Sequence, residues 1–293
     1  DTADFIACHN PSYVVRYDVL DGIKEGGVFL LNSPWSAAEM DEKLPAALKQ
    51  IIAKQKVKFY NVDAVKIAAA TGMGGRINTI MQAAFFKIAN VIPVDKAVEY
   101  IKYAIKKTYG AKGDKVVNMN IAAVDRGIEA VEEIKYPAAW ANATTGATLE
   151  EIKVPDYIKN VVKPVLRLEG DKLPVSAFEP DGTVPVGTTQ YEKRGIAISV
   201  PVWAPETCIQ CNQCAFVCPH AAIRPYLVKK DVMAKAPAGF KTKAATGFDG
   251  YEFRMQVAPL DCTGCGNCAD ICPVKEKPLV MTTLEDVAQA EGE

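Results

Sequence analysis

Two stretches near the end of the chain, CIQCNQCAFVCP (208–219) and CTGCGNCADICP (262–273), share the spacing C-x2-C-x2-C-x3-C-P. Three cysteines so closely spaced supply three thiolates from one turning loop. A fourth cysteine followed by proline is directed away from that loop, and this spacing is typical of bacterial proteins that hold two [4Fe–4S] clusters. The fourth cysteine of each stretch then binds the other cluster. The rule predicts two crossed ligand sets: Cys208, Cys211, Cys214 and Cys272 for cluster 1, and Cys262, Cys265, Cys268 and Cys218 for cluster 2.

The residues between the cysteines fit this interpretation. Gly264 and Gly266 lie where the backbone passes close to a cluster, and glycine tolerates both the close approach and a positive φ. Backbone N–H groups in the loops are expected to donate to sulfur and to tune the reduction potential. Four apolar residues are expected to shield the sulfurs from water: Ile209, Phe216, Val217 and Ile271.

Clustered cysteines can also bind zinc or form disulfides. Structural zinc sites usually take two separated C-x-x-C pairs rather than three evenly spaced cysteines and a Cys-Pro. Disulfides suit small secreted proteins, and they rarely have this spacing. Zinc therefore stays as the alternative to two iron–sulfur clusters, and a zinc protein would be colourless.

The overall composition is that of a globular protein. The 293 residues are 49% hydrophobic and 24% charged, and the formal net charge is −1, which gives no global field for nucleic acid or a membrane surface. No apolar run approaches the roughly 20 residues that span a bilayer. No signal peptide is recognised, although the chain opens with Asp1 and could be a fragment. Thiolate metal sites favour a reducing compartment, so a cytoplasmic location is expected.

The first part of the chain alternates short apolar runs with longer amphipathic ones. Three runs are predicted as buried strands: 3–8, 26–32 and 57–62. A helix is predicted over 36–54, with Ser36 and Glu39 as a capping box and Pro45 kinking or splitting it. Three further helices are predicted: about 76–90, 94–109 and 121–135. Strands alternating with helices predict an α/β domain of parallel βαβ units.

Changes in composition divide the chain into three parts. An α/β domain is predicted over 1–140, and an irregular, proline-rich linker domain over 141–199. A small α+β domain of the bacterial two-cluster ferredoxin type is predicted over 200–293, with an insertion over 221–260 between the repeated cysteine stretches.

Some polar residues leave two interpretations open. The glycines in TGMGGRINTIMQAAFF (71–86) precede a helix that has Arg76 in its first turn, so they either cradle a phosphate or form a helix–helix turn. Asn120 is predicted as a helix N-cap. Cys8, inside an apolar strand, is predicted to be a buried small hydrophobic residue.

Taken together, these segments resemble the pyruvate:ferredoxin (flavodoxin) oxidoreductases over nearly the whole chain. ACHNPSYVVRYDVLDGIKEGGVFLLNSPW (7–35) and GRINTIMQAAFFKIANVIP (75–93) are similar to that family's gamma domain, which is associated with coenzyme A. TTQYEKRGIAISVPVW (188–203) is similar to the connecting domain named for its Glu-Lys-Arg, and the cysteine region is similar to the inserted two-cluster ferredoxin domain.

The resemblance implies a function for each part. The family oxidises pyruvate to acetyl-CoA and CO2 with thiamine diphosphate and Mg2+, and passes electrons through three [4Fe–4S] clusters to ferredoxin or flavodoxin. The eight cysteines would hold two of those clusters, and coenzyme A would contact Arg76, Asn78 and Asn120. The implied partners are the remaining domains of a homodimeric enzyme, with no nucleic acid and no membrane.

The chain also departs from the family pattern. No thiamine diphosphate motif and no cysteines for a third cluster are visible, and by comparison with the family pattern the chain is expected to start partway through the gamma domain. Alone, it is therefore expected to be inactive towards pyruvate. The competing hypothesis is a stand-alone electron carrier, a two-cluster ferredoxin fused to a docking domain. Activity of the complete polypeptide with pyruvate and coenzyme A would separate the two.

Overall fold

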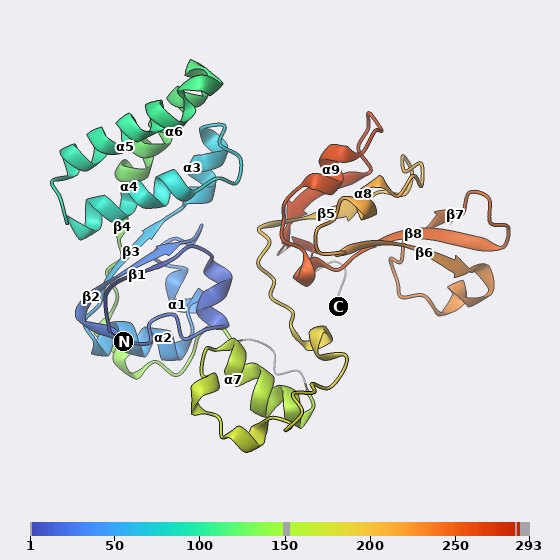
Figure 1. The fold of residues 1–293 in the computed structure, drawn as a ribbon, viewed down its shortest axis with the longest axis horizontal. Coiled ribbons are helices and arrows are strands. Elements are labelled where there is room, and N and C mark those ends of the chain that lie inside the picture. The colour runs from blue at the N-terminus through green and yellow to red at the C-terminus, as the bar shows by residue number, and fades with distance from the viewer. Residues whose placement is uncertain (1, 149–152, 285, 288–293) are drawn as a thin grey trace. The chain divides into compact units, whose positions relative to one another are not determined.

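A computed structural model describes residues 2–148, 153–284 and 286–287. The chain divides into two compact units, Asp1–Ala177 and Phe178–Glu293 (Figure 1). Within the described residues, no helix is long and apolar enough to cross a membrane.

A four-stranded sheet organises the first unit. Its strands β1 (Ala3–Cys8), β2 (Ile23–Asn32), β3 (Lys58–Val62) and β4 (Glu132–Glu133) lie in that order. β1, β2 and β3 are parallel to one another, and β4 is antiparallel to β3. The three predicted strands and their parallel pairing are confirmed, whereas the short antiparallel edge was not anticipated.

The predicted helix over 36–54 is present in two pieces. α1 (Met40–Lys43) and α2 (Ala46–Lys54) are separated at Pro45, which forms the N-cap of α2. The capping box is confirmed, because the Ser36 backbone N–H donates to Glu39 Oε2 over 2.8 Å and the Glu39 N–H faces Ser36 Oγ at 3.4 Å. The predicted split is also confirmed. It arises because proline has no backbone N–H to donate within a continuous helix.

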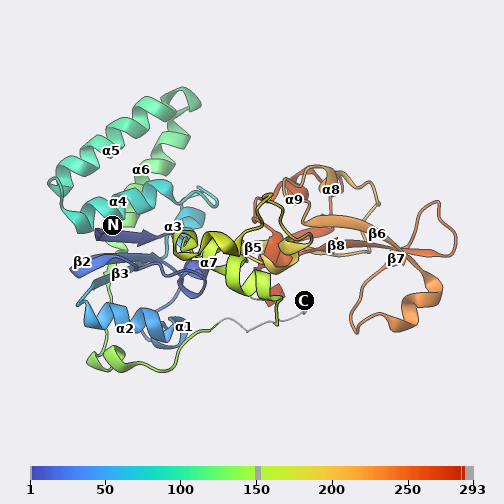
Figure 2. The ribbon, with the colours of Figure 1, turned by 60° about the horizontal axis from the view of Figure 1, so that its bottom comes forward.

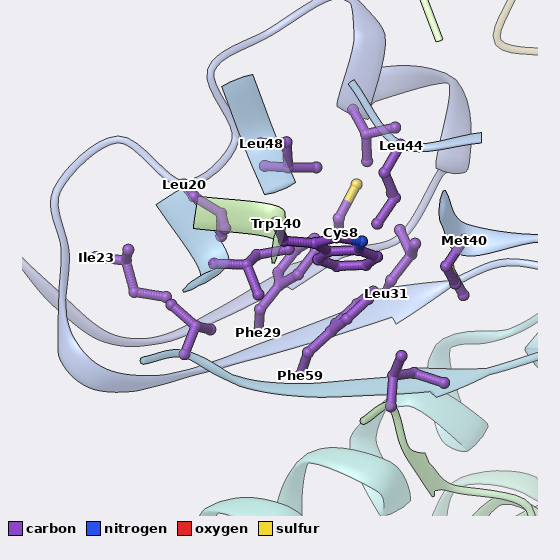
Figure 3. Packing of buried hydrophobic residues seen from close by; sticks show 14 residues of the cluster. Cys8, Leu20, Ile23, Phe29, Leu31, Met40, Leu44, Leu48, Phe59 and Trp140 are labelled. Atoms are coloured by element: carbon purple, nitrogen blue, oxygen red, sulfur yellow. The ribbon is translucent and has the colours of Figure 1, made fainter. Parts of the chain in front are cut away.

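Helices cover both faces of the sheet (Figure 2), and alternate residues of β2 pack against the two layers. Phe29 and Leu31 pack with α1 and α2 and with Trp140 (Figure 3), whereas Leu30 packs with the opposite layer. That layer contains α3 (Ala64–Ala70), α4 (Asn78–Ala89), α5 (Val94–Tyr109) and α6 (Asp114–Glu129). Both faces of the central strand are thus buried, as in sheets with parallel βαβ units.

The helix predicted over 121–135 is wrong at both ends. α6 begins at Asp114, directly after Gly113 with φ +90°, and ends at Glu129. Glu132 and Glu133 pair with β3 instead. Asn120 therefore lies in the middle of α6 rather than at its N-cap, and its Nδ2 donates to the carbonyl of Val116 over 2.8 Å. Here tertiary pairing and a glycine start signal override the apolar periodicity.

Short turns dominate the chain between the sheet and the cysteine region. The described residues of 137–198 contain one short α-helix, α7 (Lys163–Leu166). It directly follows a π-helical turn over Ile158–Val162. The 181–189 stretch contains no strand, in line with the predicted irregular structure.

Two small antiparallel sheets build the second unit. β5 (Ser199–Trp203) pairs with β9 (Leu279–Thr283). The predicted insertion forms the second sheet, in which β8 (Tyr251–Val257) lies between β6 (Ile223–Lys229) and β7 (Lys243–Ala244). The short helices α8 (Gln213–Phe216) and α9 (Asn267–Ile271) lie within the cysteine stretches and contact each other.

The sequence repeat is also a backbone repeat. In the second stretch Gly264 and Gly266 have φ of +70° and +78°, and in the first Gln210 and Asn212, at the equivalent positions, have φ of +59° and +61°. The positive φ expected of both glycines is confirmed. At Gly264 an added Cβ would lie 2.9 Å from the carbonyl oxygen of Ser199, whereas nothing lies within 4 Å of one added at Gly266.

We expect Gly264→Ala to destabilise the second unit more than Gly266→Ala. Both substitutions place an L-residue at positive φ, at a cost of about 1–2 kcal/mol, but only the first adds a backbone clash. Thermal unfolding of the cluster-loaded variants, with iron content measured in parallel, checks this. Equal losses of Tm would contradict the role of the Ser199 contact.

Cys8 is buried in the core of the first unit (Figure 3) and its Sγ donates to the carbonyl of Asn10 over 3.1 Å. The prediction of a buried hydrophobic role is confirmed. Burial raises the pKa of the Cys8 thiol to about 11, with a smaller opposing effect of the Asn10 hydrogen bond.

The pKa of Cys8 predicts alkaline destabilisation of the first unit. Because the folded state holds this proton more tightly than the unfolded chain, the stabilisation is complete below pH 9 and is lost as the pH rises towards 11, by about 2–3 kcal/mol. Urea unfolding of wild type and Cys8→Ala between pH 8 and 11 tests this, and the loss of stability should be smaller in the variant. Parallel pH profiles would contradict the assignment.

Candidate functional site

Each predicted set of four cysteines lines its own cavity in the second unit. The first cavity is bordered by Cys208, Cys211, Cys214 and Cys272. Three of these come from the loop leading into α8, and the fourth comes from the end of the other cysteine stretch.

The second cavity is lined by three cysteines of the second stretch and one of the first. Cys262, Cys265 and Cys268 line it together with Cys218, the last cysteine of the first stretch. The crossed grouping expected from the spacing rule therefore matches which cysteines share a cavity in the structure.

Apolar residues from the sheets close the first cavity. Trp203 on β5, Met255 on β8 and Leu279 on β9 line it. They were not anticipated, although the alternation of apolar and polar residues in β8 was a signal that one face of that strand is buried. Of the predicted shielding residues, Ile209 lines the first cavity, whereas Phe216, Val217 and Ile271 line neither. Phe216 is 87% exposed and Ile271 is 43% exposed, so the prediction is wrong for these two.

Backbone N–H groups donate to three of the sulfurs. Gln210 N lies 3.4 Å from Cys208 Sγ, and Gly264 N lies 3.3 Å from Cys262 Sγ at the equivalent position of the repeat. Ala222 N lies 3.3 Å from Cys218 Sγ. The expected N–H to sulfur bonds are confirmed, and they favour negative charge on the sulfurs.

Two of the cysteine thiols have strongly raised pKa values. Burial raises the pKa of Cys214 and Cys268 to about 11, with smaller opposing effects from the backbone N–H groups of Ala215 and Ala269 and smaller increases from neighbouring thiols. Burial also raises the pKa of Cys262. Without a positive centre these thiols keep their protons at neutral pH, so binding of a metal centre must release protons.

The donor set fits a multi-iron cluster. All nine cysteines are free thiols, and thiolate sulfur is the ligand that iron–sulfur clusters require. In the described part of the chain, no three His, Cys, Asp or Glu side chains are grouped closely enough to hold a single metal ion. Each set of four instead surrounds a cavity, and a [4Fe–4S] cluster is held by such a set with one thiolate per iron.

The Glu-Lys-Arg segment is attached to the start of the second cysteine stretch. Lys193 Nζ lies 2.6 Å from Asp261 Oδ2, and Asp261 directly precedes Cys262. Next to it, the backbone N–H of Gly195 donates to the carbonyl of Leu260 over 2.9 Å. This partly exposed ion pair contributes up to about 1 kcal/mol, so its main effect is to position the loop.

The three residues expected to contact coenzyme A do not line one cavity. Asn78, the first residue of α4, lines a cavity of about 410 Å3 with residues of α4 and α5. Arg76 is exposed in the turn before α4, and Asn120 is buried in α6. The glycines before Arg76 lie between α3 and α4, which confirms the helix–helix turn.

Three family models match successive parts of the chain. A pyruvate ferredoxin/flavodoxin oxidoreductase model matches residues 1–130, and a 4Fe-4S double cluster binding domain model matches residues 207–275. Between them, residues 147–197 match the EKR domain, a domain of unknown function.

Curated proteins match the chain almost from end to end. It is 64% identical to the pyruvate:ferredoxin oxidoreductase of Moorella thermoacetica, over 99% of this chain and 25% of that protein. It is 54% identical to the pyruvate-flavodoxin oxidoreductase of Enterobacter agglomerans, over 97% of this chain and 24% of that protein. A mitochondrial pyruvate dehydrogenase [NADP(+)] of Euglena gracilis is 47% identical, over 92% of this chain and 15% of that protein.

The chain thus spans about a quarter of the length of its bacterial relatives. The matches cover both the sheet unit and the cysteine unit, and they agree with the resemblance seen in the sequence segments. In sequence, this chain corresponds to a segment of the pyruvate:ferredoxin (flavodoxin) oxidoreductases.

Proposed function

We propose that this chain is the electron-relay and coenzyme A-side segment of an enzyme that oxidatively decarboxylates pyruvate to acetyl-CoA and CO2. The observation that carries the proposal is the pair of cavities, each lined by four cysteines in the crossed grouping of a two-cluster domain. The match to a double-cluster family model over these residues supports it. Pyruvate as substrate rests on the names of the relatives.

The two cavities support the crossed ligand sets. Cluster 1 is held by Cys208, Cys211, Cys214 and Cys272. When bound, a cluster with four thiolate ligands supplies one-electron transfer and leaves no iron open to substrate.

Cluster 2 is held by Cys262, Cys265, Cys268 and Cys218. Apolar side chains of β5, β8 and β9 line both cavities, and the backbone N–H groups described above favour negative charge on the sulfurs.

Coenzyme A is assigned to the first unit through Arg76, Asn78 and Asn120. The exposed guanidinium of Arg76 is suited to a phosphate, and Asn78 lines the neighbouring cavity. One of the two amide N–H groups of Asn120 donates to the carbonyl of Val116, which leaves the second N–H and the carbonyl oxygen for a ligand.

We expect Arg76→Ala to weaken coenzyme A binding about tenfold, as loss of a charge-assisted hydrogen bond would. Isothermal titration calorimetry of coenzyme A against the cluster-loaded chain measures this. Lys96→Ala, an exposed cation on α5, is the matched control and should bind normally. Equal affinity of Arg76→Ala and wild type would remove Arg76 from the site.

The remaining parts of the reaction belong to other domains. They would supply thiamine diphosphate, Mg2+ and a third cluster in a homodimeric, cytoplasmic enzyme. Ferredoxin or flavodoxin is the proposed acceptor, by analogy with the names of the bacterial relatives.

Paired cysteine substitutions test the crossed ligand sets. Cys208→Ala with Cys272→Ala removes two ligands of one cluster, so about four iron atoms and one reduced [4Fe–4S] EPR signal should remain. Cys208→Ala with Cys218→Ala removes one ligand from each cluster, so no intact four-iron signal should remain.

The two double variants have the same number of substitutions and share Cys208→Ala, so each controls for the other. The reverse result, with one intact cluster only in the Cys208/Cys218 pair, would show uncrossed ligation. A wild-type chain that binds zinc and no iron after anaerobic reconstitution would refute the relay itself.

A separate measurement tests the enzyme assignment. The complete polypeptide that contains this segment should reduce ferredoxin or flavodoxin only when pyruvate and coenzyme A are both supplied. Cluster-dependent electron transfer without any such activity would instead favour a two-cluster carrier.

A further inference from the structure

Trp203 presents a buried hydrogen-bond donor that the protein does not use. The residue is 6% exposed, and its Nε1 is shielded from solvent without any hydrogen-bond partner in the structure. By contrast, Nε1 of Trp140 in the first unit donates to Asp41 Oδ1 over 2.7 Å. A buried donor without an acceptor is destabilising, so an acceptor at Trp203 is expected.

The surroundings of Trp203 place it beside the first cysteine set. It ends β5, opposite Leu279 of β9, and its ring meets Phe253 edge to face at 6.0 Å between centroids. It packs in the same cluster of side chains as Cys208 and Cys214, and it lines the cavity that these cysteines share with Cys211 and Cys272.

The acceptors available in that cavity are few. Its other lining side chains are apolar, apart from the thiols and Asn212, whose Oδ1 is buried and also lacks a partner. Trp203 Nε1 and Asn212 Oδ1 do not bond to each other in the structure. A cluster bound by the thiols would bring anionic sulfur, a strong acceptor, into the space next to the indole.

The two cavities differ in the hydrogen-bond donors that line them. Both have a backbone N–H donor at equivalent positions of the repeat, Gln210 in the first and Gly264 in the second. No indole lines the second cavity within the described residues, where β5 contributes Pro201. The indole donor therefore distinguishes one cluster site from the other.

We propose that Trp203 Nε1 donates a hydrogen bond to a sulfur of cluster 1 and raises the reduction potential of that cluster. The inference rests on the proposed cluster-binding function and adds a positioning and tuning residue to it. Reduction adds one electron, and hence one negative charge, to the cluster. A fixed N–H dipole stabilises the reduced form more than the oxidised form, with no proton transferred.

Replacement of the indole by a ring without N–H tests the effect on potential. In the anaerobically reconstituted complete chain, Trp203→Phe should make one of the two midpoint potentials more negative. A tenfold change in the reduction equilibrium, the order of magnitude expected, corresponds to 59 mV for a one-electron couple. The second potential and the iron content should not change.

Phe253→Leu is the matched control. It perturbs the packing against the indole but keeps the N–H, so neither potential should shift comparably. Unchanged potentials in Trp203→Phe, or equal shifts of both, would overturn the proposal. So would a comparable shift of the same potential in Phe253→Leu, because packing would then explain the effect.

Isotope labelling of the wild-type chain gives a direct readout that does not depend on a variant folding. With indole-15N tryptophan, pulsed EPR of the reduced clusters should detect 15N coupling to one of them. Trp203 is the one tryptophan of the three in the chain that lines a cysteine cavity in the described structure.

Asn212→Ala removes the rival acceptor and should leave this 15N coupling intact. Absence of coupling in a protein with about eight iron atoms would overturn the role of Trp203 and leave the relay standing. Absence of iron would instead overturn the relay, and the proposal with it.

Discussion

The second unit depends on one geometric constraint: each cavity must be completed by a cysteine from the opposite half of the repeat. Cys272 reaches the cavity of the first stretch, and Cys218 reaches that of the second. Each stretch places three of its four cysteines at one cavity and the fourth at the other. The two halves must therefore fold against each other, and the contact between α8 and α9 is the packing consequence.

The surrounding sheets serve this constraint. β5 and β9 bring Trp203 and Leu279 to one cavity and Pro201 and Met281 to the other, so one short ribbon lines both. The hairpin of β6 and β8 adds Met255 to the first cavity and Val257 to the second. Residues two positions apart on a strand lie on the same face, so the two cavities are lined by successive positions along one face of each strand.

The Glu-Lys-Arg segment has a comparable supporting role. Its Lys193 is paired with the carboxylate that directly precedes Cys262, and Gly195 is bonded to the backbone of Leu260. The segment thereby fixes where the second cysteine stretch begins. In the first unit, β2 is the corresponding organiser, since its alternate residues Phe29 and Leu30 contact the two opposite helix layers.

Where periodicity or spacing is local, the sequence predicted the structure well. The three parallel strands, the capping box at Ser36 and the break at Pro45 each depend on residues a few positions apart, and all are present. The crossed cysteine grouping was also predictable, because the spacing within a short loop limits which thiolates can converge.

Long-range packing decided the rest. The segment after Glu129 pairs with β3 instead of extending α6, and Phe216 lies at the surface although it is apolar and within a cysteine stretch. The unpartnered indole N–H of Trp203 was invisible in the sequence as well. By itself the sequence determined the ligand chemistry and the local elements, because these depend on neighbouring residues. Only the tertiary structure decided which side chains face each cluster site, because that depends on how distant strands pack.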